Sequence, residues 1–363
     1  MNGVTTVKTA LFNETYHAAY EYVSDFTAFT LLNAMKAEGI DLNGPVRESR
    51  LLSQIACSEV NRPLLNWALH FLEQQEFVRK TTGPGGTAVL TLTAKGRDWT
   101  NPGNPFPAVH VAPSLKLIEY AGTFWLRAIR GEVQPQHRLF NREGIALWEV
   151  YFHNAHDLYA VHNQWAAEEL ADLIPAESCT ILELGTGFGS ATRALLTEIR
   201  LRSKFVEEYT VSDASRLLAA KAGRMLEGEL PPHKLRQLTL DINEVKSGGE
   251  TYDFIYAVNV MHCAEDLALS LDALRRLLKP GGRIVLSECV REHYRSRLHQ
   301  EFIFSLLPDF KPVGGADGDT SCFGFLRPED WWEVMQAAGF RDIGVKMNEG
   351  PVRGAIITGS RED

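Results

Sequence analysis

The order of apolar and polar positions divides the chain into a helical N-terminal half and a C-terminal half in which strands and helices alternate. Aromatic and aliphatic side chains recur at helical spacing over residues 16–35, which predicts a helix with a broad apolar face. Two further helices are expected over 51–57 and 63–75, and the alternating segments 77–80 and 88–92 predict two strands around a Gly- and Pro-rich turn. This order is typical of a helix-turn-helix followed by a wing.

The second half shows the pattern of a sheet that carries helices on both faces. Residues 101–107 form a Pro/Gly-rich break before a helical bridge, in which 115–129 is the clearest helix. Apolar runs of strand length then alternate with helical segments, which specifies a mainly parallel sheet. The expected strands are 181–184, 209–212, 238–240, 254–260, 283–288, 343–346 and 355–358. We predict an α/β protein with a Rossmann-like, mainly parallel seven-stranded sheet over residues 165–363. A mainly helical, winged-helix-like domain (1–100) and a linker with a helical bridge (101–164) precede it.

Charge and composition favour a small-molecule partner. The 363 residues have a formal net charge of -9, which disfavours unspecific binding to nucleic acid or to an anionic membrane. The expected recognition helix, within residues 61–77, carries one Arg and two Glu among mostly apolar positions, which disfavours DNA binding. No secretory leader pattern and no apolar run of about 18 residues occurs, so a cytoplasmic protein without a membrane span is expected.

The cysteines suggest neither a disulfide framework nor a zinc knuckle. They are scattered, odd in number and without a CxxC pair, which fits a reducing compartment. The five are Cys57, Cys179, Cys263, Cys289 and Cys322.

A glycine-rich loop carries the main chemical signal. Glu183, Gly185, Gly187 and Gly189 follow an apolar strand and precede a helix, and glycines there let the backbone turn tightly and approach a ligand. S-adenosylmethionine carries an ammonium and a sulfonium but no pyrophosphate. An acid at the loop entrance therefore suits this cofactor better than it suits a dinucleotide.

Two more acids stand at the carboxyl ends of the next two strands, where open α/β sheets bind their ligands. Asp213 is placed to accept the ribose hydroxyls of a nucleoside, and Asp241 with Ile242 is placed to meet an adenine amino group and ring face. Each acid alone fits a solvated loop or a helix cap, but three acids at successive strand ends favour a shared ligand.

The run 183–189, Asp213, Asp241 and the segments 252–262 and 274–288 resemble the successive motifs of class I S-adenosylmethionine-dependent methyltransferases. The resemblance covers about residues 165–358. It implies S-adenosyl-L-methionine as the cofactor.

By the same resemblance, Gly185, Gly187 and Asp213 hold the methionine and ribose ends of the cofactor, Asp241 holds its adenine, and Asn259 lies by the methyl group. The N-terminal half resembles the dimerisation domain of small-molecule O-methyltransferases, a family with bacterial relatives that methylate α-keto acids. A homodimer is therefore expected, and the apolar stripe from Tyr22 to Leu32 supports it, since it exceeds what a small lobe can bury alone.

His262 follows the fourth expected strand, at the same sheet edge as the cofactor, and the resemblance implies a general base there. Many O-methyltransferases continue with Asp-Trp, whereas this chain has Cys263-Ala264, which puts a phenolic acceptor in doubt.

Some α-keto acid C-methyltransferases of this architecture hold a metal through histidines, and imidazole is a suitable ligand for iron or zinc. A bound divalent metal is therefore a further possibility, and the sequence assigns no ligands to it. The further histidines of this region are His153, His156, His162, His293 and His299.

The sequence thus favours C-methylation of a small α-keto acid such as 2-ketoarginine, in specialised metabolism. O-methylation of a hydroxyl or phenol is the alternative of the same class. A non-catalytic, winged-helix DNA-binding regulator is the alternative of another class.

Overall fold

The computed structural model describes two compact units. It covers residues 3–103, 105–106, 109–153, 158–229, 234–245, 250–308, 310–313 and 322–362. The sheet unit comprises Met1–Glu14, Phe152–Glu292 and Phe325–Asp363, and the helical unit comprises Thr15–Tyr151 and His293–Gly324.

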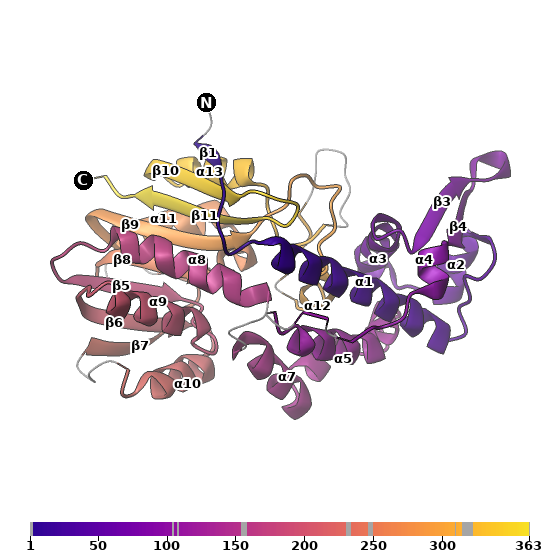
Figure 1. Ribbon diagram of the computed structural model, residues 1–363, viewed down its shortest axis with the longest axis horizontal. Coiled ribbons are helices and arrows are strands. Elements are labelled where there is room, and N and C mark those ends of the chain that lie inside the picture. Colours follow the sequence, from indigo (N-terminus) through magenta and orange to yellow (C-terminus); the bar gives the residue numbers. More distant parts are fainter. Residues whose placement is uncertain are drawn as a thin grey trace. The chain divides into compact units, whose positions relative to one another are not determined.

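The sheet unit is built on one large, mostly parallel sheet (Figure 1). Among the described residues its strand order is β1-β10-β11-β9-β8-β5-β6-β7. Strand β11 runs antiparallel to both of its neighbours, whereas β6, β5, β8 and β9 pair in parallel. The strand bounds are β1 Val4–Val7, β5 Cys179–Leu184, β6 Val206–Asp213, β7 Leu235–Thr239, β8 Tyr252–Val258, β9 Leu278–Cys289, β10 Arg341–Asn348 and β11 Gly354–Ser360. The predicted α/β class with a mainly parallel sheet is therefore confirmed.

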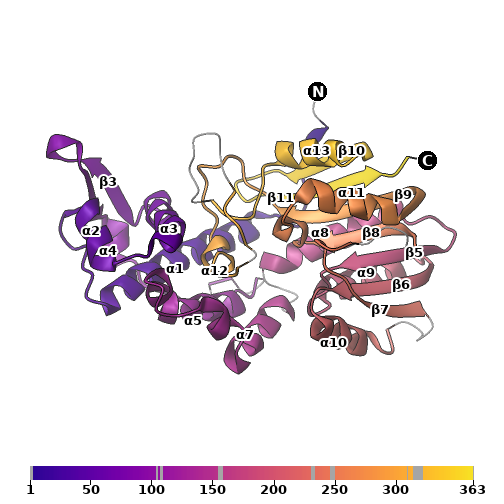
Figure 2. The same cartoon turned by 180° about the vertical axis from the view of Figure 1, so that it is seen from behind.

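Helices cover both faces of this sheet. In Figure 1, α8 and α9 lie in front of it, and in the reverse view of Figure 2, α11 and α13 do. An apolar core lies on the second face, where Leu182, Ile255 and Leu286 of the strands pack with Leu274 and Trp331 of the helices. The helix bounds in this unit are α8 Leu158–Leu173, α9 Ser190–Leu201, α10 Arg216–Leu226, α11 Leu267–Leu277 and α13 Pro328–Ala337.

The sheet has an eighth strand among the described residues, one more than the sequence predicted. Strand β1 pairs in parallel with β10, with Val4 opposite Val345 and Val7 opposite Asn348. The compact units accordingly cross the expected boundaries at residues 100 and 164, because residues 1–14 join the sheet and residues 293–324 join the helices. A four-residue strand has too little periodicity to be recognised from sequence.

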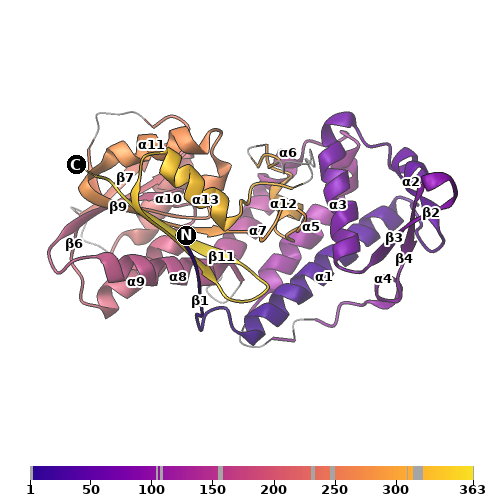
Figure 3. The same cartoon turned by 90° about the horizontal axis from the view of Figure 1, so that it is seen from above.

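The helical unit contains a small antiparallel sheet of order β2-β4-β3. Figure 3 shows its strands together with α2 and α4 near one end of α1. The predicted sequence of helices followed by a β-hairpin is present, and whether it works as a winged helix stays a prediction. The bounds are α1 Glu14–Ala37, β2 Val46–Arg47, α2 Glu48–Ile55, α3 Arg62–Gln74, β3 Val78–Thr82, β4 Ala88–Leu92, α4 Ala94–Asp98, α5 Ala112–Ile129, α6 Pro135–Leu139, α7 Arg142–His153 and α12 Glu301–Phe304.

The apolar stripe of α1 is largely covered within its own unit. The rings of Tyr22, Phe26 and Phe29 surround Trp99 at centroid distances of 6.3, 6.4 and 5.0 Å. Trp125 of α5 is also buried. This chain therefore supplies much of the burial that the homodimer hypothesis assigned to a second copy, and the homodimer stays a prediction. None of the helices in the described part of the chain is long and apolar enough to span a membrane.

Asp253 ties three neighbouring strands together where they begin. Its Oδ2 accepts hydrogen bonds from the Thr180 backbone N–H at 2.7 Å, the Thr180 hydroxyl at 2.9 Å and the Lys279 ammonium at 2.8 Å. Burial alone would raise the pKa of Asp253, but the hydrogen bonds from Lys279 and Thr180 hold it below its ordinary value. The folded state therefore favours the ionised carboxylate.

We predict that Asp253→Ala lowers the free energy of unfolding at pH 7 by about 1 to 2 kcal/mol, because three donors lose a charged acceptor. The effect should shrink as the pH falls below about 4, where the wild-type carboxyl is protonated and its stabilisation is lost. Urea unfolding at pH 7 and at a pH below about 4 measures the difference in unfolding free energy between the variant and the wild type. Glu362→Ala, which breaks an exposed pair with Arg341, is the control and should cost less than about 0.5 kcal/mol. Equal effects of the two substitutions would contradict the prediction.

Candidate functional site

The glycine-rich loop joins β5 to α9 and has a left-handed backbone at each glycine. The φ angles of Gly185, Gly187 and Gly189 are 57°, 55° and 77°. A Cβ on Gly185 would lie 2.5 Å from Val260 Cγ2, whereas a Cβ on Gly187 would meet only the Gly185 carbonyl oxygen, at 3.8 Å. A side chain at 187 would thus project into open space above the loop, where a predicted cofactor could approach the backbone.

Asp213 ends β6 beside this loop. Its Oδ2 accepts a hydrogen bond from the Gly187 N–H at 3.0 Å, and its Oδ1 accepts one from the Ser215 N–H at 2.8 Å. Burial raises the pKa of Asp213 above its ordinary value. A carboxylate has about four acceptor positions, so both oxygens retain capacity for the two hydroxyls of a ribose.

Asp241 and Ile242 follow β7 at the same edge of the sheet. The backbone joins them to Asp213, because the Leu240 N–H donates to the Asp213 carbonyl oxygen at 3.1 Å. The exposed Asp241 carboxyl accepts a hydrogen bond from the Asn243 N–H at 2.8 Å, and Ile242 packs against the apolar core on the second face of the sheet. The neighbouring strand ends therefore bring Asp213 and Asp241 together as predicted.

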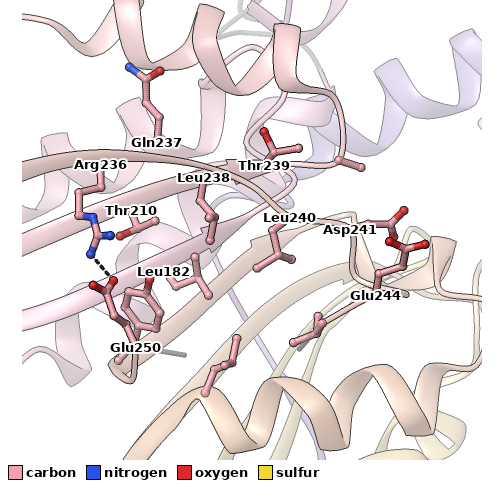
Figure 4. Close-up of a pocket in the computed structure, with 14 residues that line it drawn as sticks. Leu182, Thr210, Arg236, Gln237, Leu238, Thr239, Leu240, Asp241, Glu244 and Glu250 are labelled. Atoms are coloured by element: carbon pink, nitrogen blue, oxygen red, sulfur yellow. Dashed lines mark hydrogen bonds and ion pairs between the residues drawn. The ribbon is translucent and has the colours of Figure 1, made fainter. Parts of the chain in front are cut away.

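A cleft of about 620 Å³ opens next to Asp241. Figure 4 shows Leu182, Leu238 and Leu240 pointing into it from one face of the sheet, with the ion pair between Arg236 and Glu250 at its far end. Asp241 thus lies on the wall of a cleft that leucines and polar side chains line together.

Glu183, the acid at the entrance of the loop, points into the protein. Its side chain is buried, and its Oε2 accepts hydrogen bonds from the Thr192 hydroxyl at 2.7 Å and the Tyr209 hydroxyl at 2.6 Å. Burial raises the pKa of Glu183 to about 7. Through these two bonds the carboxyl links β5, β6 and α9 beneath the loop, and its predicted contact with the cofactor stays a prediction.

Asn259 and His262 lie where β8 ends. Asn259 has a φ of 53°, its N–H donates to the Ser287 carbonyl oxygen at 2.7 Å, and its Oδ1 accepts from the Cys289 N–H at 2.8 Å. The chain then forms a short 3-10 turn, Met261–Cys263, that carries His262. Val260, which precedes this turn and stands two residues before His262, is the residue that approaches Gly185 of the glycine loop.

Glu288, the penultimate residue of β9, fixes the His262 turn. Its Oε1 accepts from the backbone N–H groups of Val260 at 3.1 Å and Met261 at 2.8 Å, and His262 Nδ1 lies 2.6 Å from its Oε2. The exposed fractions of the His262 and Glu288 side chains are 6% and 0%. A carboxylate on Nδ1 holds the proton there, which leaves Nε2 as the atom that exchanges a proton with a substrate.

The two side chains form an acid-base pair. Burial alone would lower the pKa of His262, but the electrostatic influence of Cys263 and Glu288 raises it well above its ordinary value. Sequence reasoning missed Glu288, although it is the last residue of the run 274–288 that carried the family resemblance. Its position at the carboxyl end of the strand next to β8 was the available signal.

The other histidines are dispersed. His153 Nε2 lies 2.7 Å from the Phe188 carbonyl oxygen, and His293 Nδ1 lies 2.7 Å from the Ser296 hydroxyl. Burial lowers the pKa of His162 to about 4 and that of His299 to about 3. His156 lies outside the described residues. The described residues include no group of three His, Cys, Asp or Glu side chains that could hold a metal ion, so they give the predicted iron or zinc no ligand set.

Residues 182–284 match a family whose model is described as "Methyltransferase domain". The match contains the glycine loop, Asp213, Asp241 and His262, in the order and at the sheet edge described above. The chain therefore carries an S-adenosylmethionine-dependent methyltransferase domain.

Much longer proteins contain sequences similar to this methyltransferase. Lovastatin nonaketide synthase mokA of Monascus pilosus is 29% identical over 235 residues, which are 64% of this chain and 7% of that protein. Polyketide synthase-nonribosomal peptide synthetase ACE1 of Pyricularia oryzae is 34% identical over 165 residues, 44% of this chain and 4% of that protein. The chain thus spans a small fraction of the length of these relatives.

Solved structures share the fold across both units of the methyltransferase. The CurJ carbon methyltransferase superposes with a TM-score of 0.73 at 18% identity, covering 96% of this chain and 93% of that one. The CMeT domain of the citrinin polyketide synthase superposes with a TM-score of 0.74 at 18% identity, covering 96% and 91%. The helical unit is therefore part of an architecture that recurs in these proteins.

We predict that Asp213→Ala and Gly187→Val weaken the binding of S-adenosylhomocysteine to the methyltransferase. The first substitution leaves ribose hydroxyls unpaired, at a cost of about 1 to 3 kcal/mol, and the second fills the space above the loop. Isothermal calorimetry measures both affinities. If both variants bound S-adenosylhomocysteine with wild-type affinity, the cofactor would not bind at this loop.

We also predict a pH-dependent stability effect at Glu183. The pKa of its carboxyl is raised to about 7 in the folded state from a reference of 4.5. The free energy of unfolding of the wild type therefore falls as the pH rises between these values, because the unfolded state ionises first. Glu183→Gln should therefore gain about 1 to 3 kcal/mol of unfolding free energy relative to wild type between pH 5 and pH 8. Urea unfolding at both pH values tests this, with the exposed Glu362→Gln as the control. A pH-independent difference would show that Glu183 is already ionised below pH 5.

Proposed function

We propose that this chain methylates a carbon atom next to a carbonyl group in an acyl chain of the polyketide type. The observation that carries the proposal is the His262–Glu288 pair, held in the turn whose preceding residue, Val260, lies against the glycine loop. The polyketide synthases among the relatives and the carbon methyltransferases among the similar structures support this acceptor class.

The bound cofactor would supply a methyl group activated by its sulfonium. The protein's first task is alignment, since the reacting carbon must lie in line with the methyl group and the sulfur. Gly185, Gly187 and Asp213 would hold the methionine and ribose ends, and Asn259 would lie near the methyl group. The two bonds from the Asn259 side chain and backbone to β9 fix that residue in its left-handed conformation.

The protein's second task is proton removal. A carbon next to a carbonyl group is a weak acid, so its deprotonation requires a strong and well-positioned base. His262 Nε2 would take this proton, while Glu288 holds Nδ1–H and stabilises the resulting imidazolium. The raised pKa of His262 makes its neutral form a stronger proton acceptor. Activity should therefore rise with pH as His262 loses its proton.

The α-keto acid that the sequence favoured shares this chemistry. 2-Ketoarginine also has an acidic C–H next to a carbonyl group, and the same base would serve it. The polyketide synthases among the relatives favour an acyl chain over a free keto acid. Both acceptors therefore belong in one test.

The test is incubation with S-adenosylmethionine that carries a deuterated methyl group, against a β-ketoacyl thioester, 2-ketoarginine and a phenol. We expect mass spectrometry to find one labelled methyl on the thioester and NMR to place it on the carbon between the carbonyl groups. A label on oxygen, or on the phenol alone, would replace the proposal with O-methylation. A label on 2-ketoarginine alone would restrict the acceptor to free keto acids.

In the same assay, His262→Ala should lower turnover by about 10²- to 10⁴-fold, the range lost when a positioned base is removed. Its affinity for S-adenosylhomocysteine should stay within about twofold of wild type. Glu288→Gln should also lower turnover, because an amide has one accepting oxygen where the carboxylate uses two, and because a neutral partner stabilises the imidazolium poorly. The exposed His293→Ala is the control and should retain full turnover. Wild-type turnover in His262→Ala would place the proton acceptor elsewhere.

A further inference from the structure

The carbonyl oxygen of Phe188, in the middle of the glycine-rich loop, is held by a side chain from outside the loop. His153, the last residue of α7, places Nε2 2.7 Å from this oxygen. A carbonyl oxygen only accepts, so Nε2 carries the proton and donates it. The imidazole edge also meets the Phe188 ring at a centroid distance of 5.5 Å and an interplanar angle of 82°.

Two neighbours complete the enclosure of Phe188. The Phe152 ring stacks on it at 5.9 Å with an interplanar angle of 22°, and Lys221 Nζ of α10 lies 4.9 Å from its ring centre. Phe152 is tied down in turn, because its carbonyl oxygen accepts a hydrogen bond from the Ser190 hydroxyl. Phe188 is only 8% exposed as a result. We call Phe152, His153 and Lys221 the Phe188 clamp.

Strand β6 restrains the loop at Thr186, whose N–H donates to the Ser212 carbonyl oxygen at 2.8 Å, and His153 adds a second restraint at Phe188. Three of its five residues are glycines with positive φ, and glycine loses more conformational freedom on ordering than any other residue. Within the loop, the Gly189 N–H donates to the Thr186 carbonyl oxygen at 2.8 Å. Asp213, which holds the Gly187 N–H, is the residue expected to turn its remaining acceptor capacity to the ribose.

We propose that His153 is a positioning residue for the cofactor, which acts through Phe188 to hold the glycine-rich loop in its binding shape. This rests on the proposed function, because it assumes that the loop binds S-adenosylmethionine. It also gives His153 a role other than metal binding or proton transfer from the acceptor. A preordered loop spares the cofactor the entropy of ordering it, so His153 should affect cofactor affinity and not the chemical step.

The experiment compares His153→Ala with His153→Gln, whose side-chain amide can still donate to the Phe188 oxygen. Calorimetry with S-adenosylhomocysteine should show about fivefold to tenfold weaker binding for His153→Ala and recovery to within about threefold for His153→Gln. KM for the cofactor should rise in parallel, while kcat at saturating cofactor stays at the wild-type value. His293→Ala is the matched control and should bind as wild type.

Hydrogen exchange of the loop amides, measured without ligand, separates this proposal from the function on which it rests. Exchange at residues 185–190 should be faster in His153→Ala than in wild type or His153→Gln. If wild type fails to bind S-adenosylhomocysteine, the cofactor assignment fails, and the exchange rates still decide whether the clamp holds the loop. Unchanged loop exchange and affinity in His153→Ala, no recovery in His153→Gln, or a loss confined to kcat would overturn the proposal.

Discussion

The hydrogen bonds of the buried Glu288 carboxyl determine the arrangement of the candidate site at the carboxyl end of β8. One of its oxygens accepts two backbone N–H groups of the turn after β8, and the other lies 2.6 Å from His262 Nδ1. A buried carboxylate is costly unless donors surround it, and this one meets three. The same three contacts that offset its burial also fix the turn and select the proton-bearing nitrogen of the imidazole.

The rest of the site follows from the ends of parallel strands. Strands β5, β6 and β8 run parallel, so the glycine loop, Asp213 and Asn259 at their carboxyl ends lie at one edge of the sheet. Short backbone links then join them, from Gly187 to Asp213 and from Leu240 to Asp213. Asp213 thus links the ends of three neighbouring elements: the glycine loop after β5, its own strand β6, and the segment that follows β7.

Sequence reasoning located most of the site because its strongest signals are local. The glycine loop, the acids that follow β6 and β7, and the histidine after β8 each lie at a strand end recognisable from hydrophobic periodicity. The orientation of Glu183 was not recoverable, because its partners Thr192 and Tyr209 come from other elements. Strand β1 and the transfer of residues 293–324 to the helical unit also depend on contacts between distant segments. Glu288 was missed because a carboxylate at a strand end has no local pattern that distinguishes an orienting partner from a solvated one.

His262 is the proposed base that removes a proton from a carbon acid, and hydrogen exchange with the solvent detects this step without methyl transfer. The α-proton of a β-ketoacyl thioester is followed by NMR in deuterated water, with S-adenosylhomocysteine bound so that no methyl group is transferred. Wild type should accelerate the loss of that proton far above the buffer rate, and His262→Ala should return it to the buffer rate. Equal acceleration by the two proteins would contradict the assignment of His262 as the proton acceptor.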